Sequence, residues 1–180
     1  FFCTQFLGAF DDNVYKNALI IMLAFHAAGM TSMSSGMLVN LCAGLFILPF
    51  FLFSATAGQL ADKYEKSTII RYVKLFEIAI MVVGAVGFMH KDLSLLIGAL
   101  FLMGLHSTIF GPVKYSILPQ HLKADEIVGG NGMVEMGTFL AILAGTILGG
   151  LLVAQEQFAL LVSATDIGIA CLGYLASRAI

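Results

Sequence analysis

The sequence of 180 residues is 59% hydrophobic and 11% charged, with a formal net charge of -2 and a mean hydropathy of +0.96. Soluble domains are roughly 45–50% apolar and about 25% charged, so this composition excludes a water-soluble globular enzyme. The positive residues form no basic stripe, which argues against a nucleic-acid partner.

Six apolar runs predict six membrane-spanning helices. A spanning helix needs about 20 mostly apolar residues, and an open chain in lipid can satisfy its backbone polar groups only as helix. We therefore expect an all-α membrane protein. No basic segment precedes the first run, which is not expected to be a signal peptide. The expected spans cover about residues 1–28, 37–57, 72–89, 93–113, 132–154 and 158–176.

The first span carries a polar stripe. Gln5, Gly8, Asp12 and Lys16 fall on one face of a helix. A charge near the middle of the bilayer costs at least ~2.5–3.5 kcal/mol, so we expect this face to line the bundle interior or a water-filled cavity. Asp12 and Lys16, one turn apart, could instead form an ion pair that only neutralises both. Asp11 points about 100° away and is expected at a contact with another helix.

The second span has no charge, and a charged connector beginning at Asp62 follows it. Positive residues near loops orient membrane helices, with the richer side in the cytoplasm. Lys91 stands alone on one side of the alternating topology, so we expect both ends of the chain to be cytoplasmic. The positive residues expected on the cytoplasmic side are Lys63, Lys66, Arg71, Lys74, Lys114, Lys123 and Arg178.

The fourth span places Ser107 and Lys114 on one face, which predicts a hydroxyl and an ammonium side by side. Lys114 could also simply extend to the cytoplasmic interface as an orientation charge. His106 is expected to be a hydrogen-bonded packing residue. The connector 114–131 is long enough for a short amphipathic helix at the interface.

The last two spans carry two kinds of signal. Glu135 lies on a polar stripe of the fifth span, and Asp166 in the sixth is isolated among small residues, so it needs a partner such as Lys or water. Ala141, Gly145 and Gly149 recur every four residues, which predicts a seam where another helix packs closely. An even number of spans with both ends inside is typical of half of a twelve-helix transporter, built from two inverted three-helix repeats.

The connector after the second span resembles the signature loop of the major facilitator superfamily, with Gly58, then Asp62 and basic residues. Glu65 stands where that family usually has a second Gly. The resemblance implies that residues 1–180 form the N-terminal half-domain of a longer transporter, with the C-terminal half as its partner. It also implies a loop that latches the cytoplasmic side by breakable contacts. The latch residues would be Gly58, Asp62, Lys63, Lys66 and Arg71.

Two other stretches, Gln5–Asn13 and Gly111–Pro119, together with the segment from Glu126 to Glu135, resemble bacterial lysophospholipid transporters, especially those fused to an acyltransferase. The resemblance implies alternating-access transport of lysophospholipids such as lysophosphatidylethanolamine across the bacterial inner membrane. The lipid would be re-acylated on the cytoplasmic side, by a fused or associated acyltransferase. No cofactor or metal is expected.

A zwitterionic lysophospholipid presents a phosphate, an ammonium and one acyl chain. We expect Asp12 to bind the ammonium and Lys114 the phosphate, because one anionic and one cationic side chain in an apolar cavity match such a head group. The acyl chain would remain against apolar helix faces. The neighbouring substrate-binding candidates are Gln5, Asn13, Lys16 and Glu135.

Two alternatives remain open at this point. A proton-coupled multidrug or metabolite carrier of the same superfamily would use Asp12 or Asp166 to carry the proton. A membrane anchor for an acyltransferase would need only the spans. No histidine is followed by an Asp five positions on, as the acyltransferase motif requires, and no Ser/His/Asp set or phosphate-binding loop is present, so we expect this segment not to be an enzyme.

Overall fold

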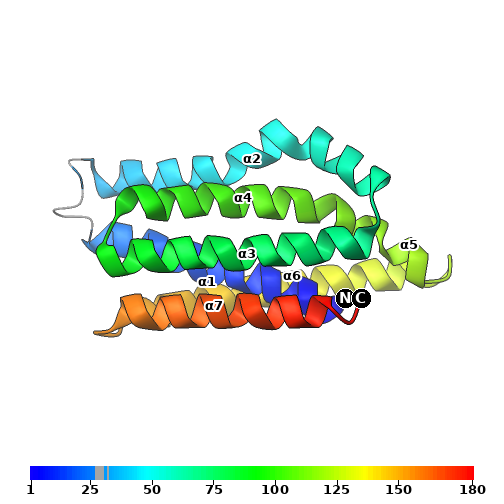
Figure 1. Ribbon diagram of the computed structural model, residues 1–180. Helices are drawn as coiled ribbons and strands as arrows, with labels where there is room; N and C mark the ends of the chain where they lie inside the picture. The colour runs from blue at the N-terminus through cyan, green and yellow to red at the C-terminus, as the bar shows by residue number, and fades with distance from the viewer. Residues whose placement is uncertain (27–30, 32) are drawn as a thin grey trace.

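The computed structural model describes residues 1–26, 31 and 33–180. These residues form a bundle of long helices with one short helix at its edge (Figure 1), which confirms the all-helical class. The predicted end of the first span at Ala28 and much of the predicted loop 29–36 lie outside the described residues. The helices are α1 (Phe2–His26), α2 (Ser35–Lys63), α3 (Lys66–His90), α4 (Leu93–Ser116), α5 (Leu118–His121), α6 (Ile127–Val153) and α7 (Phe158–Ser177).

Two helices begin well before the spans predicted for them. The third span was expected from residue 72, whereas α3 begins at Lys66 because the Glu65 carboxylate accepts hydrogen bonds from the backbone amides of the first turn. The fifth was expected from residue 132, whereas α6 begins at Ile127. Hydropathy marks where a helix enters lipid, and it does not detect helical turns that continue into water or the interface.

Four helices within the described residues are long and apolar enough to cross a membrane: α2, α4 together with α5, α6, and α7. The other two long helices carry internal charges. Asp11, Asp12 and Lys16 interrupt α1, and Lys74 and Glu77 interrupt α3. The structure is therefore a multi-pass membrane domain. Some of the charged residues of α1 and α3, namely Asp11, Lys74 and Glu77, are buried inside it.

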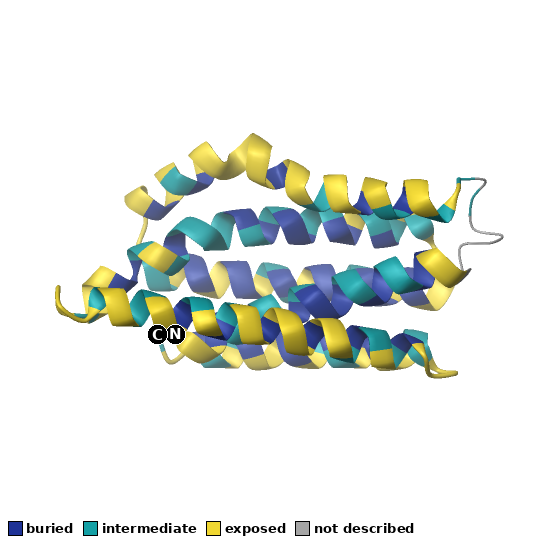
Figure 2. Cartoon of the chain, turned by 180° about the vertical axis from the view of Figure 1, so that it is seen from behind, coloured by how far each residue is buried: buried dark blue, intermediate teal, exposed yellow. Residues whose placement is uncertain are grey.

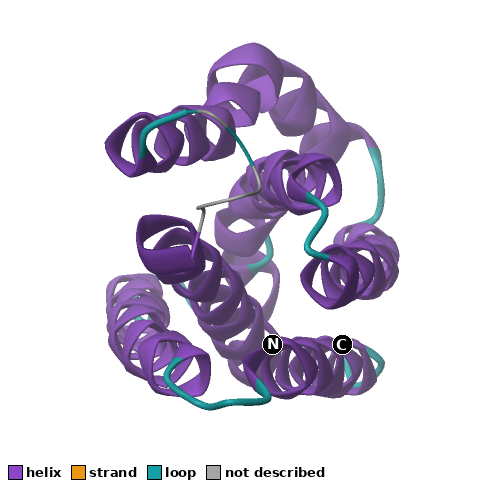
Figure 3. Cartoon of the chain, turned by 90° about the vertical axis from the view of Figure 1, so that its left-hand side faces the viewer, coloured by secondary structure: helices purple, strands orange, loops and turns teal. Residues whose placement is uncertain are grey.

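The helices pack in pairs around one core. α1 lies along α6 and α7, α2 lies along α4, and α3 lies between α4 and α7, as the end view in Figure 3 shows. Tyr15 joins three of these helices, since its ring packs edge-on against Phe88 and its hydroxyl donates to the Leu96 carbonyl at 3.0 Å. The core around it is apolar.

Small residues allow α1 and α6 to approach closely. A Cβ placed on Gly145 would lie 2.6 Å from the Phe10 carbonyl oxygen, and one on Gly149 would lie 2.6 Å from the Val14 carbonyl oxygen. Ala141 is completely buried. The predicted seam of small residues in the fifth span is confirmed, and its partner is α1.

The outer faces of α2 and α6 remain uncovered (Figure 2), with Phe51 84% and Phe139 69% exposed. α2 is also bent and contains Pro49, which cannot donate a helical hydrogen bond. Such large apolar faces need lipid or further helices against them.

Both chain ends, the α2–α3 loop and α5 gather at one end of the bundle, and the turn between α3 and α4, which contains Lys91, lies at the other (Figure 1). Most of the positive residues grouped by sequence lie at this first end. Lys74 does not belong with them: its side chain is completely buried between helices. The expectation that it lies near a loop is therefore not met, and a buried charge must be explained by its partners.

Candidate functional site

A polar cavity of about 190 Å³ lies between α1 and α4. The stripe predicted along the first span supplies one wall, and the face of Ser107 and Lys114 supplies the other. Three of the predicted substrate-binding residues, Gln5, Asp12 and Lys114, are therefore brought together. The lining residues are Gln5, Gly8, Ala9, Asp12, His106, Ser107, Phe110, Gly111, Lys114 and Tyr115.

Asp12 supplies the negative charge of the cavity. One carboxylate oxygen accepts a hydrogen bond of 2.5 Å from the Ser107 hydroxyl, while the other, Oδ1, is buried with no hydrogen-bond partner among the described residues. A buried carboxylate oxygen without a donor is costly. This oxygen therefore lacks a donor that a water molecule or a ligand would have to supply.

Lys114 supplies the positive charge and is already paired. Its Nζ donates to Glu135 Oε1 at 3.0 Å and to the Thr138 hydroxyl at 2.8 Å. The Tyr115 hydroxyl donates to the same Glu135 oxygen at 2.5 Å. Glu135 does not line the cavity, and its role here is to hold the ammonium of Lys114 against α6. An incoming anion would compete with this carboxylate.

Gln5 connects the two sides of the site. Its Nε2 donates to the Val134 carbonyl at 3.2 Å, and its Oε1 accepts from the Thr138 hydroxyl at 3.1 Å. Since Thr138 also accepts from Lys114, one hydrogen-bonded chain runs from α1 through α6 to α4. Gln5 is buried, so it fixes this geometry and offers little free surface to a ligand.

Asn13 and Lys16 lie outside the cavity, contrary to the grouping expected from sequence. The Asn13 amide donates to the Ala9 carbonyl at 2.7 Å on its own helix. Lys16 Nζ lies 5.1 Å from the centre of the Phe46 ring on α2 and borders a separate cavity. The ion pair between Asp12 and Lys16, which the sequence left open, does not form between the described side chains. The ammonium of Lys16 lies over the aromatic ring of Phe46 on α2 instead.

A buried group of charges next to the cavity was not predicted from the sequence. Lys74 Nζ and Glu77 Oε2 form an ion pair at 2.5 Å, with side chains 0% and 1% exposed. His106 Nε2 lies 3.4 Å from the same Glu77 oxygen. The spacing of Lys74 and Glu77, three residues apart in a predicted span, puts both on one helix face and could have indicated this pair. By sequence alone, Lys74 groups with the positive residues of the loops instead.

Two more carboxylates complete this group. Asp11 on α1 and Asp166 on α7 are both buried. Both Asp11 oxygens and Oδ1 of Asp166 lack hydrogen-bond partners among the described residues. The prediction that Asp11 faces another helix is confirmed. The interior thus holds Asp11, Asp12, Glu77 and Asp166 with Lys74 and His106.

Within the described part of the chain, no ion pair joins the predicted latch residues. Nothing lies within 4 Å of a Cβ placed on Gly58, so no described helix approaches it closely. Asp62 and Arg71 are exposed, and within the described residues neither forms an ion pair. Glu65 has a local role instead: hydrogen bonds from the Ser67 side chain and from the backbone amides of Ser67 and Thr68 lower its pKa to about 2.

Comparison with known proteins agrees with this architecture. Residues 1–177 match the Major Facilitator Superfamily. The chain is 30% identical to the lysophospholipid transporter LplT of Cronobacter sakazakii over 151 residues, which are 82% of the chain and 34% of the relative. It is 31% identical to LplT of Salmonella paratyphi B, covering 88% of the chain and 37% of the relative. For LplT of Photorhabdus laumondii the identity is 30%, covering 93% and 39%.

These relatives are named as transporters, and the chain spans between a third and two-fifths of their length. No solved structure matches the chain. The match to the superfamily covers nearly every residue described above, including both walls of the polar cavity. This chain belongs to the major facilitator superfamily.

Proposed function

We propose that residues 1–180 form the N-terminal six-span half of a lysophospholipid transporter, which moves lysophospholipids across the bacterial inner membrane by alternating access. The observation that carries the proposal is the cavity in which Asp12 and Lys114 face one space from α1 and α4. The named relatives give the substrate class. At about 190 Å³ the cavity is smaller than the roughly 300–1,000 Å³ of pockets that enclose a whole small organic ligand, so it would take the polar head group alone, while the acyl chain would lie along apolar helix faces.

Each charge of the cavity has a proposed role. Oδ1 of Asp12, which has no donor among the described residues, would accept from the ammonium of an ethanolamine head. Lys114 would exchange Glu135 for the lipid phosphate, so binding would break the contact between α4 and α6. A ligand that replaces one ion pair by another changes the balance between two helix arrangements, as alternating access requires.

The proposed inverted repeat is supported by the way the helices pair. Exchanging α1 with α4, α2 with α6 and α3 with α7 maps the α1–α6 contact onto the α4–α2 contact. The same exchange maps α3–α4 onto α7–α1 and leaves α3–α7 unchanged. Six spans follow if α1 and α3 also cross, with their charges facing inward, where buried partners receive them.

The proposed orientation places both ends of the chain in the cytoplasm, where the latch would meet the C-terminal half. Among the described residues, nothing lies within 4 Å of a Cβ placed on Gly58, and Asp62 is exposed, which suits contacts with helices outside this chain. A cytoplasmic acyltransferase, fused or associated, is the proposed consumer of the transported lipid.

A second candidate is a proton-coupled carrier of the same superfamily. The buried carboxylates of Asp11, Glu77 and Asp166 outnumber the one buried lysine described near them, Lys74. Excess buried negative charge favours binding of a proton. This candidate differs from the first in its substrate, a drug or a metabolite, and in its use of the proton gradient, so one experiment that measures lipid uptake with and without the gradient separates the two.

The test uses the purified full-length protein in proteoliposomes, with labelled lysophosphatidylethanolamine and a matched set of vesicles without protein. Protein-dependent lipid uptake that persists after a protonophore collapses the proton gradient is the expected result. Uptake that stops with the gradient favours the proton-coupled carrier. No protein-dependent uptake of the lipid under either condition contradicts the proposed substrate.

A further inference from the structure

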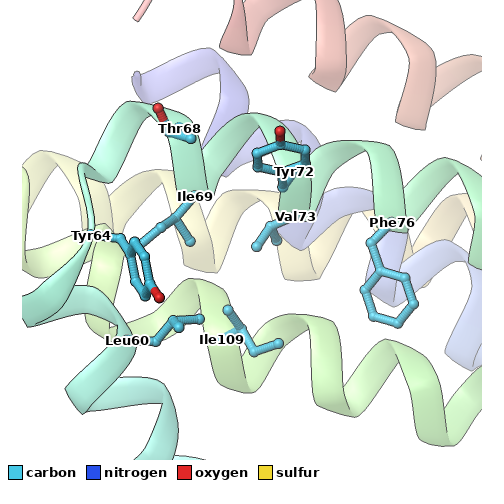
Figure 4. Close-up of a pocket in the computed structure, with 8 residues that line it drawn as sticks. All are labelled: Leu60, Tyr64, Thr68, Ile69, Tyr72, Val73, Phe76 and Ile109. Carbon is cyan, nitrogen blue, oxygen red and sulfur yellow. The ribbon is translucent and has the colours of Figure 1, made fainter.

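A second, larger cavity lies on the far side of α4 from the polar site. It has a volume of about 400 Å³ and is almost wholly apolar. Ile109 borders it, two residues from both Ser107 and Gly111 of the polar cavity, so the two sites occupy opposite faces of one helix. The lining residues, shown in Figure 4, are Leu60, Tyr64, Thr68, Ile69, Tyr72, Val73, Phe76 and Ile109.

The cavity is an open groove that runs along α3. Figure 4 shows Ile69, Val73 and Phe76 extending from α3 toward Leu60 of α2 and Ile109 of α4, with Tyr64 at the end nearest the α2–α3 loop. From Thr68 to Phe76 the helix rises about 12 Å at roughly 1.5 Å per residue. That length is less than half of the ~30 Å hydrocarbon layer, so the groove fits within one leaflet.

The two ends of the groove differ in polarity. Val73, Phe76 and Ile109 give the deep end aliphatic and phenyl groups, whereas Tyr64 and Thr68 lie at the end near the loop, with Tyr72 between the two ends on α3. Lys63 Nζ lies 5.5 Å from the centre of the Tyr64 ring, which places its ammonium at this mouth. Arg71, one turn beyond Thr68, is exposed and forms no ion pair within the described residues.

The charge at this mouth is available to an anion. The segment 62–71 beside this mouth holds three positive residues, Lys63, Lys66 and Arg71, and two negative ones, Asp62 and Glu65. The Glu65 carboxylate is occupied, because it accepts hydrogen bonds from the backbone amides at the start of α3 and from the Ser67 hydroxyl. The segment from Asp62 to Arg71 therefore carries one more positive than negative residue. Basic groups at the edge of an apolar groove near the membrane surface match a phosphate head group above an acyl chain.

We propose that this groove binds one acyl chain of an anionic phospholipid of the surrounding bilayer, with its phosphate between Lys63 and Arg71. The ligand is a resident lipid and not the transported molecule, because α4 separates the groove from the polar cavity. The volume of about 400 Å³ lies within the range of about 300–1,000 Å³ of pockets that hold small organic ligands. The open side lets the second chain of the same lipid remain in the bilayer.

The test reconstitutes the full-length protein in phosphatidylcholine vesicles that contain a trace of phosphatidylglycerol with a photoreactive group at the end of one acyl chain. Crosslinked peptides are then identified by mass spectrometry. We expect labelling to concentrate on 69–76 and on the segment around Ile109. A phosphatidylcholine probe of the same chain should label these segments several-fold less.

Two variants and two matched controls decide the result. Ile109→Trp fills the groove and should reduce groove labelling at least about tenfold, whereas Val82→Trp, on an exposed face of α3, should not. Arg71→Gln, at an exposed position that should not disturb folding, should reduce it several-fold, and Lys91→Gln at the opposite end should not. Equal labelling by the two probes, labelling unchanged by Arg71→Gln, or no labelling because the C-terminal half covers the groove would each overturn the proposal.

Discussion

The buried ion pair between Lys74 and Glu77 gives a prediction about stability. The two side chains are 0% and 1% exposed and 2.5 Å apart, so neither charge can be solvated when its partner is removed. Breaking a buried pair by removing one member costs about 3–5 kcal/mol. Proteins are commonly stable by only about 5–15 kcal/mol, so either single substitution should remove a large share of the total.

The two single variants should differ in severity. Lys74 compensates Glu77 and also lies near Asp11 and Asp12, so Lys74→Met leaves several carboxylates uncompensated. Glu77→Gln leaves one ammonium, which those aspartates can still partly compensate. We therefore expect Lys74→Met to be the more destabilising. The double variant Lys74→Met/Glu77→Gln should recover part of the loss, because it removes both members of the pair.

The assay heats the solubilised full-length protein and follows labelling of buried Cys42 by a thiol-reactive dye, in a background where the exposed Cys3 and Cys171 are serine. Substitution of exposed Lys91 by Met is the matched control and should leave the midpoint unchanged. If the double variant is as unstable as the sum of the two single variants, the side chains are not coupled. The ion pair would then not explain why two charges are buried in α3.

Three further predictions concern packing, capping and topology. Gly145→Val should weaken the α1–α6 contact by about 1–3 kcal/mol, because the added atoms meet the Phe10 carbonyl; an unchanged unfolding midpoint would show that the helices can separate without cost. Glu65→Ala should cost of order 1 kcal/mol through loss of the α3 cap. Since the pKa of Glu65 is lowered from 4.5 to about 2, this difference should be complete above pH 4.5 and shrink as the pH falls toward 2; a difference that grows on acidification would contradict it. In a cysteine-free background, a cysteine at Glu156 should react with an impermeant reagent added outside intact cells and one at Glu65 should not, whereas the reverse pattern would invert the proposed orientation.

Much of the fold followed from hydrophobic pattern alone, because lipid forces apolar runs into helices. The spacing of small residues predicted that the face of Gly145 packs closely against another helix. It did not predict that this helix is α1, because only packing in three dimensions identifies the partner. Helix ends were the weakest prediction, since the extra turns before residue 72 depend on the Glu65 cap and not on hydropathy.

The polar residues show a similar division. Periodicity placed Asp12 and Lys114 on inward faces, and the structure brings both to one cavity. It did not predict that Glu135 pairs with Lys114, because that contact joins two helices whose rotation sequence alone leaves free. Lys16 differs from its expected place for a related reason. Periodicity gives the direction in which its side chain leaves α1, but it does not show that α2 is the neighbouring helix at this height in the bundle, where the ammonium lies over the Phe46 ring.

The most direct test of whether Asp12 and Lys114 bind the lipid head group compares uptake of two labelled lipids by spheroplasts that express the full-length protein at matched levels. Asp12→Asn should reduce uptake of lysophosphatidylethanolamine more than that of lysophosphatidylglycerol, which has no ammonium. Lys114→Gln should weaken both, since removing one member of a desolvated charged contact costs about 2–5 kcal/mol, at least about tenfold in affinity. Lys16→Gln, outside the cavity, is the control and should change neither. Equal loss of both lipids in Asp12→Asn, with no loss of either in Lys114→Gln, would contradict the assignment of these two residues to the lipid head.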